Sequence, residues 1–163
     1  MPAVSQQAKA ASLRPATVAD MQRVFDWRNS DFITERSSSR SRIDWSEHQR
    51  WFAEQLNDPR SLMFIVEIGE TPHGIVRFER SSPSEAVITV YLEKATTGHG
   101  AGIKAIKDGC LLAVDRFGIR HVVACVRLDN AMGLAAFPKA GFARSADVGQ
   151  CPPQHARFIW SAA

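Results

Sequence analysis

Residues 91–103, with the sequence YLEKATTGHGAGI, constrain the fold of this chain more than any other stretch. An apolar, β-rich run over residues 86–92 leads into it, glycines follow at positions 98, 100 and 102, and an amphipathic helical pattern begins at residue 103. A turn from a strand into a helix directs unpaired backbone N–H groups to one point, where the helix dipole favours an anion. Glycine has no Cβ, so a phosphate can come close to the backbone. The stretch predicts either an anion-binding loop or a simple tight turn.

Two nucleotide-binding patterns do not fit this stretch. The Walker pattern requires Lys-Ser or Lys-Thr directly after its last glycine, whereas Ile103, Lys104 and Ala105 follow here. The dinucleotide pattern requires G-x-G-x-x-G near the start of a βαβ unit. Here the glycine spacing is G-x-G-x-G, and the whole N-terminal half of the chain precedes it.

The length and composition predict one globular domain. The chain has 163 residues, of which 45% are hydrophobic, and no apolar run reaches the ~20 residues of a membrane helix. Residues 1–11 are polar and alanine-rich and lack the apolar segment of a signal peptide, so we expect a disordered tail there. The domain is expected over residues 12–163, without a linker or a repeat.

The charge and the cysteines restrict the function only mildly. The net charge of +3, from 20 basic and 17 acidic residues, is compatible with an anionic ligand and equally with an ordinary soluble protein. Cys110, Cys125 and Cys151 are odd in number and lack the spacing of a metal site. We therefore expect a reduced, cytoplasmic protein without a metal.

The order of the expected elements indicates an α+β domain. Residues 13–15 read as an edge strand, and two helices follow, the second capped by Asp44 and carrying Trp45, His48 and Phe52 on one face. Three strands at short spacing predict an antiparallel meander, and a strand, helix and strand then predict a right-handed parallel crossover. The later expected elements are strands 62–68, 74–79 and 86–92, a helix at 103–117 closed by Gly118, strand 121–126, a short helix capped by Asn130, and strands 142–148 and 157–160.

Three polar features of the N-terminal half each allow two interpretations. Arg28 is either a surface residue at a helix end or part of an acceptor pocket facing an anionic or hydroxyl-rich ligand. The serine and arginine run at 36–42 is either a solvated loop or a lid over a phosphorylated substrate. His48 lies on an apolar stripe, where a hydrogen-bonded core histidine is the alternative to a catalytic one.

Two segments of the chain resemble the GNAT acetyltransferases. The sequence TGHGAG at residues 97–102 is similar to the family's acyl-CoA pyrophosphate loop, Arg/Gln-x-x-Gly-x-Gly/Ala, and departs from it at Thr97. The segments VRLDN at 126–130 and KAGF at 139–142 resemble the family's V-x-x-x-N … K-x-G-F pattern, in which the asparagine caps a helix near the CoA arm. The resemblance covers the chain from about residue 13 to residue 160 and implies the GNAT fold.

The resemblance implies acetyl-CoA as co-substrate and direct attack by a neutral amine on the thioester. Acetyl-CoA would lie where the strand that ends at Leu92 and the strand that ends near Val126 diverge, and Cys110 and Cys125 would be core or site-lining residues, not nucleophiles. The residues that the resemblance places at the CoA are Leu92, Glu93, Thr97, Gly98, His99, Gly100, Ala101, Gly102, Asn130 and Phe137.

Phe137 departs from the family pattern. GNAT enzymes commonly carry at this position a tyrosine that protonates the leaving thiolate, which phenylalanine cannot do. Tyr91, the only tyrosine of the chain, or water would then supply the proton. The alternative is a degenerate domain that binds CoA without catalysis.

The N-terminal half is similar to the nucleotide-aminosugar N-acetyltransferases of the pseudaminic-acid type. WRN at residues 27–29 and IDWSEHQRWF at 43–52 carry this resemblance. It implies an acceptor pocket lined by Arg28, His48, Trp51 and Cys125, in which His48 orients the amine or relays its proton.

A small-molecule amine is therefore the expected partner, and a nucleotide-linked aminosugar is the leading acceptor. Acetylation of a protein N-terminus or of an antibiotic amine stays open. We expect no nucleic-acid binding, because the basic run at 36–42 has no interleaved aromatic residues. We expect no membrane partner, because no apolar run is long enough for a membrane helix. The chain is expected to be a monomer or a homodimer.

Overall fold

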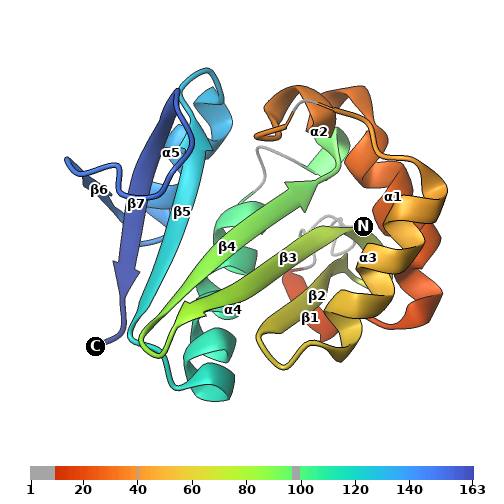
Figure 1. Ribbon diagram of the computed structural model, residues 1–163, viewed down its shortest axis with the longest axis horizontal. Helices are drawn as coiled ribbons and strands as arrows, with labels where there is room; N and C mark the ends of the chain where they lie inside the picture. Colours follow the sequence, from red (N-terminus) through yellow and green to blue (C-terminus); the bar gives the residue numbers. More distant parts are fainter. Residues whose placement is uncertain (1–9, 40, 97–99) are drawn as a thin grey trace, which may run out of the picture.

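The computed structural model describes residues 10–39, 41–96 and 100–163 (Figure 1). These residues form one seven-stranded sheet with helices on both faces. The elements are, in chain order, β1 Ala11–Pro15, η2 Val18–Asp20, α1 Met21–Asn29, α2 Asp31–Arg36, α3 Trp45–Asn57, β2 Ser61–Ile68, β3 Thr71–Ser82, β4 Glu85–Leu92, η3 Lys94–Thr96, α4 Ala101–Phe117, β5 His121–Arg127, α5 Ala131–Lys139, β6 Ala143–Ser145 and β7 His155–Ser161.

The sheet is mixed, as predicted. Its strand order is β1-β2-β3-β4-β5-β7-β6, in which β1 to β4 form an antiparallel meander and β5, β7 and β6 a second antiparallel set. The two sets join through one parallel pair, β4 with β5. The connection between them is α4, so this is the expected crossover. The α+β fold class is confirmed.

The parallel pair is joined over three residues only. Glu85–Val87 of β4 pairs with His121–Val123 of β5. Beyond these residues the two strands no longer pair with each other, although β4 extends to Leu92 and β5 to Arg127. Figure 1 shows β4 and β5 diverging beyond this joint. Backbone groups on the facing edges of the two strands are therefore left without a partner strand.

Two apolar clusters cover the two faces of the sheet. The larger one contains buried residues of α4 and α5 together with Val76 and Phe78, which alternate on β3. The smaller one contains residues of α1, α2 and α3 together with Ile75 of β3, and Tyr91 of β4 packs against it. This alternation follows from the two-residue period of a strand and decides which side chain faces which set of helices.

The element boundaries differ from the sequence-based prediction in three places. The short helix α2 was not predicted; it begins after Ser30, whose hydroxyl accepts a hydrogen bond from the Ile33 N–H. The strand expected at 142–148 is only three residues long, and 146–154 is a connection between β6 and β7. β1 includes Ala11, which is 4% exposed and paired with Ile68, so the domain begins before residue 12.

The expectation of a fully reduced chain is wrong. Cys125 of β5 and Cys151, in the connection between β6 and β7, form a disulfide with a Cα–Cα distance of 5.5 Å. The connection returns the chain to β5, which no sequence spacing indicates, while Cys110 is free and buried in α4. The cytoplasmic location, which was inferred from reduced cysteines, stays a prediction.

The described ranges also bear on membrane insertion and on metal binding. None of the helices there has both the length and the apolar character needed to cross a membrane. No three His, Cys, Asp or Glu side chains within 10–39, 41–96 and 100–163 gather in a way that suits a metal ion.

Candidate functional site

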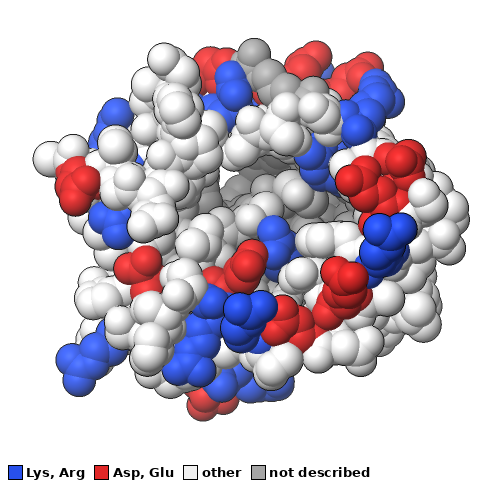
Figure 2. Space-filling view, viewed as in Figure 1, with Lys and Arg blue, Asp and Glu red and all other residues white. Residues whose placement is uncertain are grey.

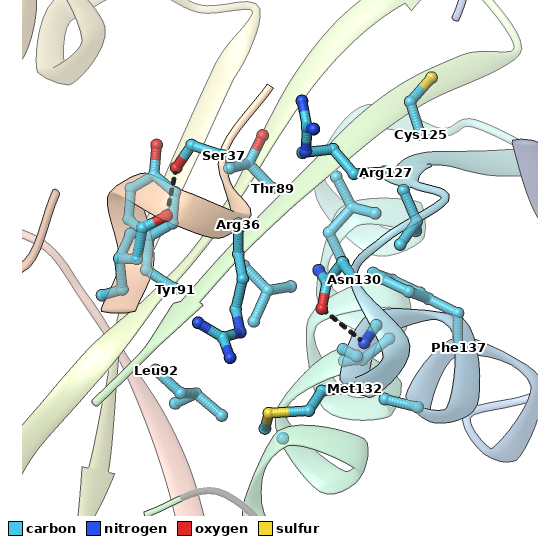
Figure 3. A pocket seen from close by; sticks show the side chains of 18 of the residues that line it. Arg36, Ser37, Thr89, Tyr91, Leu92, Cys125, Arg127, Asn130, Met132 and Phe137 are labelled. Atoms are coloured by element: carbon cyan, nitrogen blue, oxygen red, sulfur yellow. Dashed lines mark hydrogen bonds between the residues drawn. The ribbon is translucent and has the colours of Figure 1, made fainter. Parts of the chain in front are cut away.

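A cavity of about 770 Å³ lies where β4 and β5 diverge. Figure 2 shows the surface hollowed on this side of the molecule, and Figure 3 shows the lining side chains from close by. The lining comes from α1, α2 and the residues that follow it, β3, β4, the start of α4, β5 and α5. The short pairing of the parallel strands is therefore what opens the site.

The alternation along the strands gives the cavity two sides with different chemistry. Ile88, Val90 and Leu92 of β4 belong to or pack against the core cluster of α4 and α5. Tyr91 packs on the opposite face, against the cluster of α1, α2 and α3. On β5, Val126 lies with the α4 and α5 cluster, so its neighbours in sequence point to the other face.

The side toward α4 and α5 is mostly apolar and includes two glycines. Gly100 caps α4 with a φ of +78°, a left-handed backbone that suits glycine. A Cβ on Gly102 would lie 3.0 Å from Leu92 Cδ1, so glycine keeps the start of α4 close to the end of β4. Thr97, Gly98 and His99 of the predicted loop lie outside the described residues.

Asn130 and Phe137 complete this side from α5. The Asn130 side chain caps the helix by accepting a hydrogen bond from the Gly133 N–H at 3.1 Å. A Cβ at Gly133 would lie 2.8 Å from both Asn130 Nδ2 and Val126 Cγ1, so only glycine fits. Phe137 lines the cavity and packs edge-on against Phe142 with ring centroids 5.1 Å apart.

The side toward α1, α2 and α3 is basic. Arg28 Nη2 donates a hydrogen bond to Ser39 Oγ at 2.6 Å, whereas Arg28 Nη1 is buried without a hydrogen-bond partner. The Arg77 guanidinium lies 5.2 Å from the centre of the Trp51 ring, and its Nε is also buried without a partner. These two nitrogens retain donor capacity within the cavity wall.

Two more arginines line the cavity, Arg36 from α2 and Arg127 from β5 (Figure 3). Arg36 lies over the Phe32 ring at 3.9 Å and donates to the Phe32 carbonyl. Arg127 donates to both carboxylate oxygens of Asp129, at 2.9 and 3.0 Å, and this raises the pKa of the guanidinium. Arg36 and Arg127 are therefore already oriented by local acceptors.

Residues 37–39 form part of the cavity wall, and Ser38 is hydrogen-bonded to β7, in the other half of the sheet. Ser38 Oγ lies 2.9 Å from His155 Nε2 at the start of β7. His155 Nδ1 lies 2.8 Å from the Pro153 carbonyl, which can only accept. Nδ1 thus donates, and Nε2 of a neutral ring accepts from the Ser38 hydroxyl.

The structure brings most of the predicted site residues together and leaves four outside the cavity. Those that line it are Arg28, Tyr91, Leu92, Gly100, Gly102, Cys125, Asn130 and Phe137. The residues outside its lining are His48, Trp51, Glu93 and Ala101. Trp51 reaches the site only through Arg77, and Ala101 is buried at the start of α4.

His48 lies in the core between α1 and α3. It is 1% exposed and surrounded by the rings of Phe25, Trp45, Trp51 and Phe52. Its Nε2 lies 2.8 Å from the Met21 carbonyl, and burial lowers the pKa of the ring. This geometry corresponds to the hydrogen-bonded core histidine that the sequence left as an alternative.

Glu93 is absent from the cavity lining and pairs with His73. Its backbone N–H donates to the His73 carbonyl at 2.9 Å, and its carboxylate lies 3.2 Å from His73 Nδ1. The backbone N–H and the carboxylate of Glu93 therefore both contact His73, at the end of the β3–β4 pairing.

Sequence reasoning missed several lining residues. Arg77 was hidden inside an expected strand, where a charged residue between Val76 and Phe78 indicates a face that is not fully packed. Residues 36–39 belong to the run that was interpreted as either a solvated loop or a lid over a phosphorylated substrate. They line the cavity, and the lid stays a prediction. Arg127 belongs to the resembling VRLDN segment but had no assigned role.

The family model of the acetyltransferase (GNAT) domain matches residues 11–143 of the chain. No curated protein sequence matches the chain significantly. The fold is similar to that of aminoglycoside acetyltransferase AAC(6')-Ib in complex with paromomycin and acetyl-CoA, with a TM-score of 0.81, 17% identity and 93% of each chain covered.

Two further solved structures have the same fold. Spermidine N-acetyltransferase from Vibrio cholerae, in complex with CoA and spermine, gives a TM-score of 0.79 at 14% identity, covering 93% of this chain and 95% of that one. The ribosomal L7/L12 α-N-protein acetyltransferase RimL, in complex with CoA, gives 0.78 at 14% identity, covering 94% and 95%. Together with the match of the family model over most of the chain, the divergent parallel strands and the glycine-capped helix identify the chain as a member of the acetyltransferase (GNAT) domain family, and hence as an acetyl-CoA-dependent N-acetyltransferase of the GNAT type.

Proposed function

We propose that the cavity holds acetyl-CoA on its apolar side and a small amine on its basic side, and that the acetyl group passes directly between them. The observation that carries this proposal is the divergence of β4 and β5 after three paired residues. A cavity that passes between two strands can admit one substrate from each face of the sheet.

The side of the cavity toward α4 and α5 suits acetyl-CoA. Its apolar surface and the edge of β4 suit the pantetheine arm, and the start of α4 suits the pyrophosphate. The unpaired edge of β4 offers backbone groups to the amides of the arm, as a partner strand would. Gly100 and Gly102 keep the start of α4 open to an anion, and the helix dipole adds to the attraction. Thr97, Gly98 and His99 are proposed to belong to the same pyrophosphate site, and Asn130 and Phe137 line the cavity from α5.

The reaction needs no acyl-enzyme. The amine nitrogen attacks the thioester carbonyl, the new C–N bond forms, the C–S bond breaks and CoA leaves as the thiolate. The amine loses one proton and the thiolate takes one up. Tyr91 is the proposed proton carrier, because its side chain lines the cavity and Phe137 has no acidic proton.

A nucleotide-linked aminosugar is the leading acceptor. Arg28, which the similarity to the pseudaminic-acid type places at the acceptor, lines the cavity, and Cys125 lines it from β5. An antibiotic amine, a polyamine and a protein N-terminus are the acceptors named for the similar structures and are the alternatives to be tested. His48 has no part in this proposal, since its ring lies outside the cavity lining.

The test is acetyl-CoA binding by calorimetry, followed by a CoA-thiol release assay with UDP-linked 4-aminosugars, spermidine, kanamycin and a peptide N-terminus. Binding with turnover on the aminosugar is the expected result. Binding without turnover on any amine would favour the degenerate domain that Phe137 suggests. No binding of acetyl-CoA would overturn the proposed site.

A further inference from the structure

The charge of the cavity lining has one sign. Five cationic residues line the cavity, and no Asp or Glu of the described chain is among its lining residues. The five are Arg28, Arg36, Arg77, Arg127 and Lys139. A low-dielectric cavity lined by one sign of charge attracts ligands of the opposite sign and repels those of the same sign.

Arg28 and Arg77 lie on the acceptor side, not on the side proposed for acetyl-CoA. Arg77 precedes Phe78 and follows Val76, which both face α4, so Arg77 points to the opposite face and contacts Trp51 of α3. Arg28 comes from α1, which packs on that face. These two arginines therefore lie on the face of the sheet opposite α4, the helix whose start carries Gly100 and Gly102.

Two of these arginines have unused donors. Arg28 Nη1 and Arg77 Nε are buried, and neither has a hydrogen-bond partner. Leaving a buried charged donor unpaired is costly, so such atoms in a native structure call for an explanation. Arg77 Nη1 has only a distant carboxylate, Glu79 at 3.5 Å, and that carboxylate is 60% exposed. Both nitrogens are closed to solvent in the ligand-free structure, so a bound acceptor atom would complete these guanidinium groups together with a shift of their side chains.

We propose that the acceptor amine carries an anionic group, a phosphate or a carboxylate, which Arg28 and Arg77 bind. Planar guanidinium groups bind both anions through paired hydrogen bonds. The same charges disfavour polycationic amines such as polyamines and aminoglycosides. This inference rests on the proposed function, because it assigns the chemical class of that function's acceptor.

The experiment uses pairs of amines that differ in the anion alone. Glucosamine 6-phosphate against glucosamine tests the phosphate, tyrosine against tyramine tests the carboxylate, and spermidine represents the polycations. Binding is measured by calorimetry with saturating CoA, and kcat/KM is measured by thiol release. We expect the anionic member of at least one pair to bind at least about tenfold more tightly, and spermidine not to bind.

The variants Arg28→Gln and Arg77→Gln test the assignment to residues. Each is expected to reduce the preference for the anionic member by about tenfold while acetyl-CoA binds with unchanged affinity. Arg116→Gln is the matched control, because it removes the same charge from an exposed position outside the cavity and is expected to keep the preference. Thermal unfolding of each variant checks that it is folded.

The outcomes separate this inference from the proposed function. Equal binding of both members in both pairs, no binding of either, or tighter binding of spermidine overturns the anionic acceptor while leaving acetyl-CoA binding intact. If Arg116→Gln also loses the preference for the anionic amine, that preference depends on the net charge of the protein. This outcome would overturn the roles of Arg28 and Arg77. Failure to bind acetyl-CoA overturns the proposed function itself.

Discussion

Ser38 and His155 are hydrogen-bonded across 117 positions of the chain, with Ser38 Oγ 2.9 Å from His155 Nε2. Ser38 belongs to the cavity wall that follows α2, and His155 is 6% exposed at the start of β7. The bond therefore joins the two halves of the sheet across the cavity. Its formation depends on a His155 ring oriented by the Pro153 carbonyl.

Ser38→Ala removes this bond and is expected to weaken the acceptor side of the site. A neutral hydrogen bond contributes about 0.5–1.5 kcal/mol, which corresponds to an increase of roughly 2- to 13-fold in the KM of the acceptor if the wall must be ordered to bind it. The affinity for acetyl-CoA should not change. Ser41→Ala, in the same run but absent from the cavity lining, is the control. An unchanged acceptor KM in Ser38→Ala would show that the bond does not position the wall.

Gly100→Val tests the start of α4. Gly100 has a φ of +78°, where a residue with a side chain is strained by about 1–2 kcal/mol, and no atom of the described residues lies within 4 Å of an added Cβ. We expect a lower melting temperature and at least tenfold weaker acetyl-CoA binding, because the side chain would project into the space proposed for phosphate. Calorimetry and thermal unfolding measure the two effects.

Gly118→Val is the matched control for this prediction. Gly118 ends the same helix with a φ of +67° and also has no neighbour within 4 Å of an added Cβ. The substitution should cause a similar loss of stability with no loss of acetyl-CoA binding. Equal affinities in the two variants would contradict the assignment of Gly100 to the phosphate site.

The sequence predicted those parts of the molecule whose signals are local. The helix ended by Gly118 and the helix capped by Asn130 were placed correctly because capping depends on neighbouring residues. The missed helix α2 has six residues, too few for a periodic pattern. Arg77, Ser38 and the disulfide of Cys125 escaped prediction because each acquires its role from a distant segment, which tertiary structure alone brings near.

The oxidation state of the cysteines is a direct test of the disulfide. Burial raises the pKa of the Cys110 thiol to about 12, so it should not react in the native protein. Alkylation with iodoacetamide and mass spectrometry should find no label in the native, unreduced chain, one label at Cys110 after denaturation, and three after denaturation with a reductant. Three labels in the denatured, unreduced chain would restore the prediction of a fully reduced protein.

The stability of the fold should decrease in acid partly through His48. Burial lowers the pKa of the folded ring below its ordinary value of 6.5, so the unfolded chain takes up this proton first. The stability contributed by the neutral ring is therefore complete above pH ~6.5 and is lost as the pH falls from there toward the folded pKa.

His48→Phe checks this by urea unfolding at several pH values. The variant loses the bond to the Met21 carbonyl, which costs about 0.5–1.5 kcal/mol at neutral pH. Its free energy of unfolding should then decrease less steeply below pH ~6.5 than that of the unmodified protein. Curves of the same slope in both proteins would show that His48 does not titrate with folding.

Phe137→Tyr tests whether the leaving thiolate lacks a proton donor. Phe137 lines the cavity from α5 but is otherwise packed against Phe142 and Phe158, so a para hydroxyl has room to act only if it points into the cavity. Because Tyr91 is the proposed donor, we expect an unchanged kcat and an unchanged KM for acetyl-CoA. A several-fold higher kcat would show that protonation of the thiolate limits turnover. Phe142→Tyr is the control: it is buried outside the cavity lining, so its hydroxyl should lower stability by about 1–3 kcal/mol without raising kcat. An unchanged kcat in Phe137→Tyr would mean that Tyr91 or water already supplies the proton. Tyr91→Phe distinguishes these two donors: if the phenol is the donor, this variant should reduce kcat by about 10²-fold.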